Sequence, residues 1–166
     1  MKRDNGQLIV EMMVAVSLLV IGLLGVFAVL SQSLGLNRVA ANQFVAANLA
    51  AEGIEVTKNI VDANFINDAQ WNLYIEDGQY EVQFDDTSLI GNEASDNPSQ
   101  QKFLSLNNGR YSYDSGGEET RFKRIITIKN SEDLTEIKVI SRVYWRDRGG
   151  VDFDIVLEDR FRNWRE

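Results

Sequence analysis

The sequence predicts an α+β protein in which a long N-terminal helix packs on a C-terminal antiparallel β-meander. Three patterns support this fold class: an apolar run near the N-terminus, apolar residues at helical spacing after it, and alternating apolar and polar residues later in the chain. The chain has 166 residues, so one domain and an anchor are the natural organisation.

The apolar run predicts a transmembrane helix over residues 7–30, because its length suits the hydrocarbon core of a bilayer. Between Met12 and Leu30 three residues are not clearly apolar: Ser17, Gly22 and Gly25. One acid, Glu11, lies at the start of the run. A carboxylate costs about 2.5–3.5 kcal/mol near the centre of such a helix and less toward its end. Its presence predicts a cationic partner within the membrane.

Helical spacing continues beyond the membrane segment, and no proline interrupts it. Residues 31–63 are predicted to form an amphipathic continuation, giving one helix from about Leu8 to about Ala63, roughly 85 Å long. The apolar stripe of this second half needs a surface to cover it, and we expect that surface to be the following domain. The stripe consists of Leu34, Val39, Phe44, Val45, Leu49, Val56, Ile60 and Val61.

Residues 64–166 are predicted to form the antiparallel β domain, lying outside the membrane. Alternating segments predict its strands, and Asn130–Asp133 and Arg146–Gly150 supply turns between the last three. Residues 85–119, rich in Asp, Asn, Ser and Gly, are expected to form an irregular loop. The residues that share a face within each strand are Tyr80, Val82 and Phe84; Phe122, Arg124, Ile126 and Ile128; Ile137, Val139, Ser141, Val143 and Trp145; and Val151, Phe153, Ile155 and Leu157.

The N-terminus, Lys2-Arg3-Asp4-Asn5-Gly6 followed by Gln7-Leu8-Ile9-Val10-Glu11-Met12, resembles the cleavage and methylation motif of type IV prepilins and pseudopilins. The resemblance implies a leader peptide over residues 1–6, which prepilin peptidase removes by cutting after Gly6. Glu11 then takes the fifth mature position, where the family has glutamate. The family usually has an N-methylated phenylalanine at the first mature position, whereas this chain has Gln7.

Three later segments, Thr120–Ile128, the strand ending Val143-Tyr144-Trp145, and the stretch through Trp164, resemble more loosely those of PilV-like minor pilins and of pseudopilin I. The resemblance implies a structural subunit of a type IV pilus-like filament, assembled through its N-terminal helix. Its implied partners are other pilin or pseudopilin subunits, prepilin peptidase, the inner-membrane assembly platform and the membrane. Glu11 would lie beside the amino group of Gln7 in an adjacent subunit. Without cysteine, the disulfide common in major pilins cannot form, which favours a minor subunit.

Two alternatives remain open at the level of sequence. A pilus, a competence filament and a type II secretion pseudopilus would all use the same N-terminal segment. An ordinary signal anchor, for which Ser31-Gln32-Ser33 offers a small-x-small site, would instead give a non-polymerising single-pass binding or sensing domain. In both cases Lys2 and Arg3 precede the apolar run, so the N-terminus is expected in the cytoplasm and the C-terminal domain outside.

Composition argues against an enzyme. Histidine and cysteine are absent, and no nucleophile elbow, P-loop or dinucleotide fingerprint is present. We therefore expect no catalytic residue, no cofactor and no metal site, although oxygen-rich stretches in residues 85–119 leave calcium as an alternative. The net charge is −8, and loss of the leader, net +1, would make it −9. Nucleic acid is therefore not an expected partner.

Overall fold

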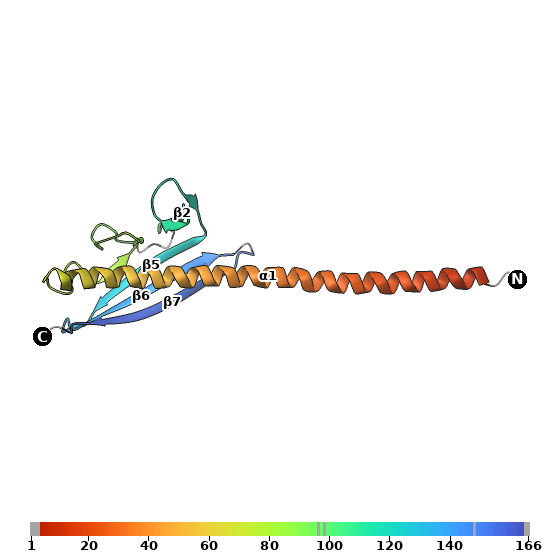
Figure 1. The fold of residues 1–166 in the computed structure, drawn as a ribbon, viewed down its shortest axis with the longest axis horizontal. Coiled ribbons are helices and arrows are strands. Elements are labelled where there is room, and N and C mark those ends of the chain that lie inside the picture. Colours follow the sequence, from red (N-terminus) through yellow and green to blue (C-terminus); the bar gives the residue numbers. More distant parts are fainter. Residues whose placement is uncertain (1–3, 96, 98, 148, 165–166) are drawn as a thin grey trace. The chain divides into compact units, whose positions relative to one another are not determined.

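One helix and seven strands make up the part of the chain that the computed structural model describes, residues 4–95, 97, 99–147 and 149–164 (Figure 1). The chain divides between Asn42 and Gln43 into two units. A long helix with antiparallel sheets confirms the predicted α+β class. The elements are α1 (Asp4–Ile66), β1 (Gly78–Tyr80), β2 (Ser105–Asn107), β3 (Arg110–Ser112), β4 (Glu118–Glu119), β5 (Phe122–Asn130), β6 (Glu136–Arg146) and β7 (Asp152–Arg162).

The first unit is the part of α1 that ends at Asn42. Leucine, alanine and methionine favour the helix, and no proline breaks it. Every side chain from Gly6 to Arg38 is exposed, including the whole apolar run. Within the described residues, no protein surface covers this length of apolar helix.

In the second unit, α1 buries one stripe against the main sheet. The stripe begins later than its spacing predicts, because Leu34 and Phe44 are exposed while burial starts around Val45. The helix ends at Ile66, three residues beyond the predicted Ala63, and the Asn64 amide donates to the carbonyls of the chain that follows. The buried residues of the stripe are Ala46, Leu49, Ala50, Gly53, Val56, Thr57, Ile60, Val61 and Phe65.

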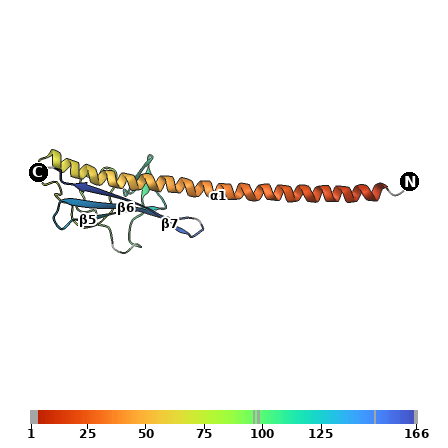
Figure 2. The same cartoon turned by 90° about the horizontal axis from the view of Figure 1, so that it is seen from below.

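The main sheet is antiparallel with strand order β1-β5-β6-β7, and α1 lies along one of its faces (Figure 2). β5, β6 and β7 form the predicted meander. The alternation predicted for β6 is confirmed, since Ile137, Val139, Ser141, Val143 and Trp145 are all buried. β7 is an edge strand, and its apolar face is only half covered. The core therefore lies between α1 and β5–β6.

Two segments differ from the sequence prediction. The strand predicted over Gln79–Phe84 is limited to β1, although Tyr80 and Val82 are buried as expected. Within residues 85–119, expected to be irregular, the short strands β2, β3 and β4 form a second antiparallel sheet of order β3-β2-β4. These strands have two or three residues each, and periodicity cannot be detected over so short a length.

Candidate assembly site

The three residues that the sequence singles out lie close together on the first unit. Gly6, Gln7 and Glu11 all belong to α1 and all are exposed. A Cβ atom at Gly6 would meet nothing within 4 Å. The rest of the predicted leader falls partly on residues 1–3, which lie outside the described residues. Among the described residues, therefore, no distant part of the chain covers the Gly6–Gln7 peptide bond.

The helix that carries these residues is long and apolar enough to cross a membrane. A window of 18 residues in this helix has a mean hydropathy of 2.8, and none of the window is buried. In water, an exposed apolar surface of this size would drive association. Length and composition thus fit a single membrane span.

Glu11 has no charged neighbour in sequence along the apolar run. It is the sole ionisable residue in the sequence between Asp4 and Arg38. In the described part of the structure no hydrogen bond or ion pair reaches its carboxylate, while the nearby Ser17 hydroxyl is satisfied by donating to the Met13 carbonyl at 2.7 Å. A carboxylate in an apolar setting without a partner is strongly disfavoured.

Within the second unit, α1 approaches the sheet most closely at Gly53. A Cβ built there would lie 2.4 Å from the Ile126 side chain and 2.8 Å from the Ser141 hydroxyl oxygen. Real Cβ atoms essentially never come this close to another atom, so a side chain here would force the Ile126 and Ser141 side chains or the helix to shift. The close approach of helix and sheet therefore favours glycine at this position, although glycine within a helix is less stable than alanine.

Beside Gly53, the sheet inserts one fully buried arginine toward the helix. Nη1 of Arg124 donates to the Leu49 carbonyl and to Oε1 of Glu52, both at 2.9 Å, and Nη2 donates to the Val82 carbonyl at 2.5 Å. The Arg124 side chain has no exposure, whereas that of Glu52 is 35% exposed. One guanidinium thus joins α1, β5 and the segment after β1. The Arg124–Glu52 ion pair thus links the helix to the sheet from within the core and differs from an ion pair between two exposed side chains.

Tyr113 contacts the backbone of the same strand. Its hydroxyl donates to the Arg124 carbonyl at 2.9 Å. Burial is the main cause that raises the pKa of the Tyr113 phenol above its ordinary value, and it outweighs the opposing effect of Arg124. The phenol is therefore neutral across the physiological range and acts as a hydrogen-bond donor that ties the second sheet to β5.

Sequence reasoning placed Arg124 on the apolar face of its strand but did not assign it a role. The detectable signal was a single charge in the alternation of Phe122, Ile126 and Ile128, together with Glu52 and Gly53 adjacent in the helical stripe. Which acid meets which base depends on how helix and sheet are docked. That docking is a tertiary property.

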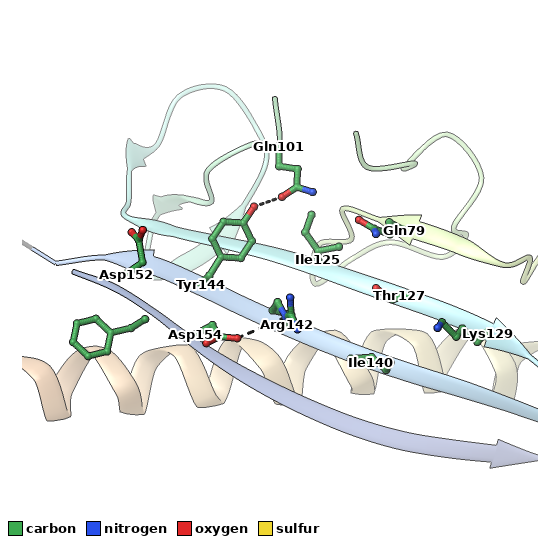
Figure 3. A pocket seen from close by; sticks show the side chains of 11 residues that line it. Gln79, Gln101, Ile125, Thr127, Lys129, Ile140, Arg142, Tyr144, Asp152 and Asp154 are labelled. Atoms are coloured by element: carbon green, nitrogen blue, oxygen red, sulfur yellow. Dashed lines mark hydrogen bonds and ion pairs between the residues drawn. The ribbon is translucent and has the colours of Figure 1, made fainter. Parts of the chain in front are cut away.

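The face of the main sheet turned away from α1 holds a shallow hollow of about 550 Å³ (Figure 3). Ile125 and Ile140 contribute its apolar part, and Lys129, Arg142 and Asp154 are among its polar side chains. At one end the Tyr144 hydroxyl donates to Oε1 of Gln101 (Figure 3). The lining of the hollow mixes apolar and charged side chains.

Ion pairs across β6 and β7 cover the rest of this face. Glu136 accepts from Arg160 at 2.8 Å and from Arg162 at 2.9 Å. The hydrogen bond from Arg162, followed by that from Arg160, lowers the pKa of the Glu136 carboxyl. A hydrogen bond from Lys138 lowers the pKa of Glu158 in the same way. These carboxylates are therefore held ionised to a lower pH than free side chains.

Among the described residues, no group of three or more Asp, Glu, His or Cys side chains is placed to hold a metal ion. Calcium in residues 85–119, left open by sequence, thus gains no geometric support. Compared with known proteins, the chain matches no family model, no curated sequence and no solved structure. Its function must therefore be argued from its own fold and residues.

Proposed function

We propose that the protein is a structural subunit of a type IV pilus-like filament, a minor pilin or pseudopilin. The observation that carries the proposal is the exposed apolar helix with a single carboxylate, Glu11, placed five residues after Gly6. The long helix followed by an antiparallel meander supports it. The subunit would be inserted as a prepilin, with its N-terminus in the cytoplasm and its C-terminal domain outside.

The mechanism is association without bond-making by the subunit itself. Prepilin peptidase cuts after Gly6 and frees the amino group of Gln7. The assembly platform then transfers the helix from lipid into a core built of the same segments in neighbouring subunits. There the carboxylate of Glu11 pairs with the Gln7 amino group of an adjacent subunit, so that both charges are compensated in a medium of low dielectric constant.

A minor rank is supported by the absence of cysteine and by Gln7 at the first mature position. An irregular loop over residues 85–119 would also have favoured a minor subunit, but this segment contains the second sheet and does not support that argument. A pilus, a competence filament and a secretion pseudopilus remain equal candidates for the machine. Neither enzymatic activity nor nucleic-acid binding belongs to the proposal.

The rival function is a single-pass anchored domain that never polymerises. Processing separates the two, because a plain signal anchor has no reason to lose only its first six residues. We expect co-expression with a prepilin peptidase to shorten the chain so that Gln7 becomes its first residue. Intact-mass measurement checks this directly.

Gly6→Leu provides the matched control, since it changes the residue before the cut and leaves the apolar helix unaltered. The variant should insert into the membrane and remain full length. A wild-type chain that stays uncut, or one that is cut near Ser33, would exclude the prepilin function.

A further inference from the structure

The face of the main sheet turned away from α1 carries a row of three like charges. Lys129 of β5 stands directly opposite Lys138 of β6, and Lys138 stands directly opposite Arg160 of β7. Like charges opposite one another across a sheet destabilise it. The row therefore has an energetic cost in the isolated subunit, and an anionic partner would relieve it.

Internal carboxylates compensate only part of this row. Lys138 pairs with Glu158 at 2.7 Å, and Arg160 pairs with Glu136 at 2.8 Å. Lys129 is exposed, and within the described residues it has no ion pair. We call Lys129, Lys138 and Arg160 the basic row.

Arg142 adds a further exposed cation next to the basic row. Its side chain is 59% exposed, and its ion pair with Asp154 is long, at 3.7 Å from Nε to Oδ2. Lys129 and Arg142 both border the hollow (Figure 3). By strand register, seven Lys or Arg and four Asp or Glu of β5–β7 lie on this face, whereas the chain as a whole has a net charge of −8.

The complementary surface lies in the second sheet and the turn before it. Asp114, Glu118 and Glu119 are exposed, and residues 114–119 contain no lysine or arginine. In the part of the chain that the structure describes, no hydrogen bond or ion pair reaches these three carboxylates. Three exposed acids within six residues are complementary in charge to the basic row.

The two surfaces lie at opposite ends of one strand. Residues 114–119 precede β5, whereas Lys129 is close to its end, and β5 spans roughly 24 Å between Phe122 and Lys129. In Figure 1 the second sheet, labelled at β2, lies beside the start of β5, and the arrowhead marks the other end. The surfaces therefore cannot meet within one copy. They can meet between two copies stacked head to tail, a heterologous contact that repeats without closing.

We propose that the basic row of one subunit docks on residues 114–119 of a second copy. The inference rests on the proposed filament function for the identity of the neighbour, and it adds a polar contact between outer domains to the contact between helices. Two adjacent copies are sufficient for this contact, so it can form whether the subunit is a major or a minor component of the filament.

Cysteine cross-linking tests the contact, because the natural chain contains no cysteine. Full-length Lys129→Cys and Glu119→Cys chains, one tagged, are mixed in detergent or co-expressed and then oxidised. We expect a mixed disulfide dimer. Lys129→Cys with Glu55→Cys, an exposed acid on α1, is the matched control and should give none. Absence of the mixed dimer, or equal yields for both pairs, overturns the proposal.

Charge reversal supplies a second measurement that does not depend on disulfide geometry. Light-scattering or chemical cross-linking of full-length Lys129→Glu should show association reduced by about fivefold relative to wild type. Lys58→Glu, the same change at an exposed site on α1, should have no effect. Combining Lys129→Glu with Glu118→Lys and Glu119→Lys should restore association. Failure of this rescue contradicts the proposal.

The outcomes also separate this contact from the proposed function. Filaments that form with no cross-link and no effect of Lys129→Glu would leave the filament function standing and remove the contact. A mixed dimer from a chain that is never cut after Gly6 would establish the contact and remove the filament function. Binding of inorganic polyphosphate that Lys129→Glu abolishes, without contact between copies, would assign the face to a phosphate ligand and overturn the proposal.

Discussion

Single residues carry the assembly chemistry at the N-terminus, and Glu11 is the most informative. Glu11→Ala makes the helix more apolar, so membrane insertion should persist or improve. Incorporation into filaments should nevertheless fall, because the amino group of the neighbouring Gln7 loses its partner. Quantifying the variant in sheared filaments and in membrane fractions checks both statements. Normal incorporation would show that the acid has no role in assembly.

Gly53 shows how a missing side chain can set the packing of an entire helix. Gly53→Ala should lower the free energy of unfolding of the second unit by about 1–3 kcal/mol, since its Cβ would overlap Ile126 and Ser141. Gly35→Ala adds the same methyl group where nothing lies within 4 Å and should not destabilise that unit. Denaturant unfolding followed by fluorescence of the buried Trp145 provides the measurement. Equal stability of the two variants would contradict the close approach.

On the sheet side of the same contact, Arg124 is the residue that binds the helix. Arg124→Met should destabilise by about 2–4 kcal/mol, because buried carbonyls of Leu49 and Val82 lose their donor. Glu52 reaches solvent and limits the loss. Arg142→Met, at an exposed site, should stay within about 0.5 kcal/mol of wild type. A stable Arg124→Met protein would show that apolar packing alone can replace the guanidinium.

At the scale of elements, β6 and β7 are joined by ion pairs that respond to acid. The folded state lowers the pKa of Glu136 below its ordinary value of 4.5. Its contribution to stability is therefore present above that pH and is lost as the pH falls through the lowered pKa. Glu136→Gln should flatten the dependence of the urea midpoint on pH in this acid range.

Salt provides the control for this prediction. The Debye length is about 3 Å at 1 M ionic strength, so exposed pairs are screened. The pH dependence of wild type in high salt should approach that of Glu136→Gln. If the two proteins have the same acid profile at low salt, the pairing with Arg160 and Arg162 contributes nothing to stability.

The packing of α1 against the main sheet forms the core of the second unit. Nine residues of α1 from Ala46 to Phe65 are buried, and their spacing follows one helical face. The edge strand β7 remains half covered, and acids and arginines line its length. Charges on an exposed edge oppose unregulated strand pairing. Contacts of the outer domain are therefore better sought on the charged sheet face than along this edge.

For the whole molecule, the buried stripe predicts which part of the chain folds without the membrane segment. A chain beginning at Gln32 keeps the stripe and should be soluble, with mixed helix and strand by circular dichroism. A chain beginning at Asn64 loses most of the stripe and exposes Ile126 and Val139, so it should aggregate. Gel filtration and thermal unfolding compare the two. Equal stability would mean that α1 does not cover the sheet.

The sequence by itself determined the helix, the meander and the N-terminal pattern of Gly6 and Glu11. These features depend on local periodicity and on charge placed in an apolar run, which the chain displays directly. The sheet β3-β2-β4 could not be read in the same way, because strands of two or three residues carry no period and their pairing comes from distant partners.

Only the tertiary structure decided the contact of Gly53, the burial of Arg124 and the basic row of Lys129, Lys138 and Arg160. Each of these arises from register or docking between segments far apart in the chain. An arginine in an alternating strand and a glycine in a helix have many possible environments. The environment is chosen when helix and sheet meet, because close packing allows one arrangement that satisfies both volume and hydrogen bonding.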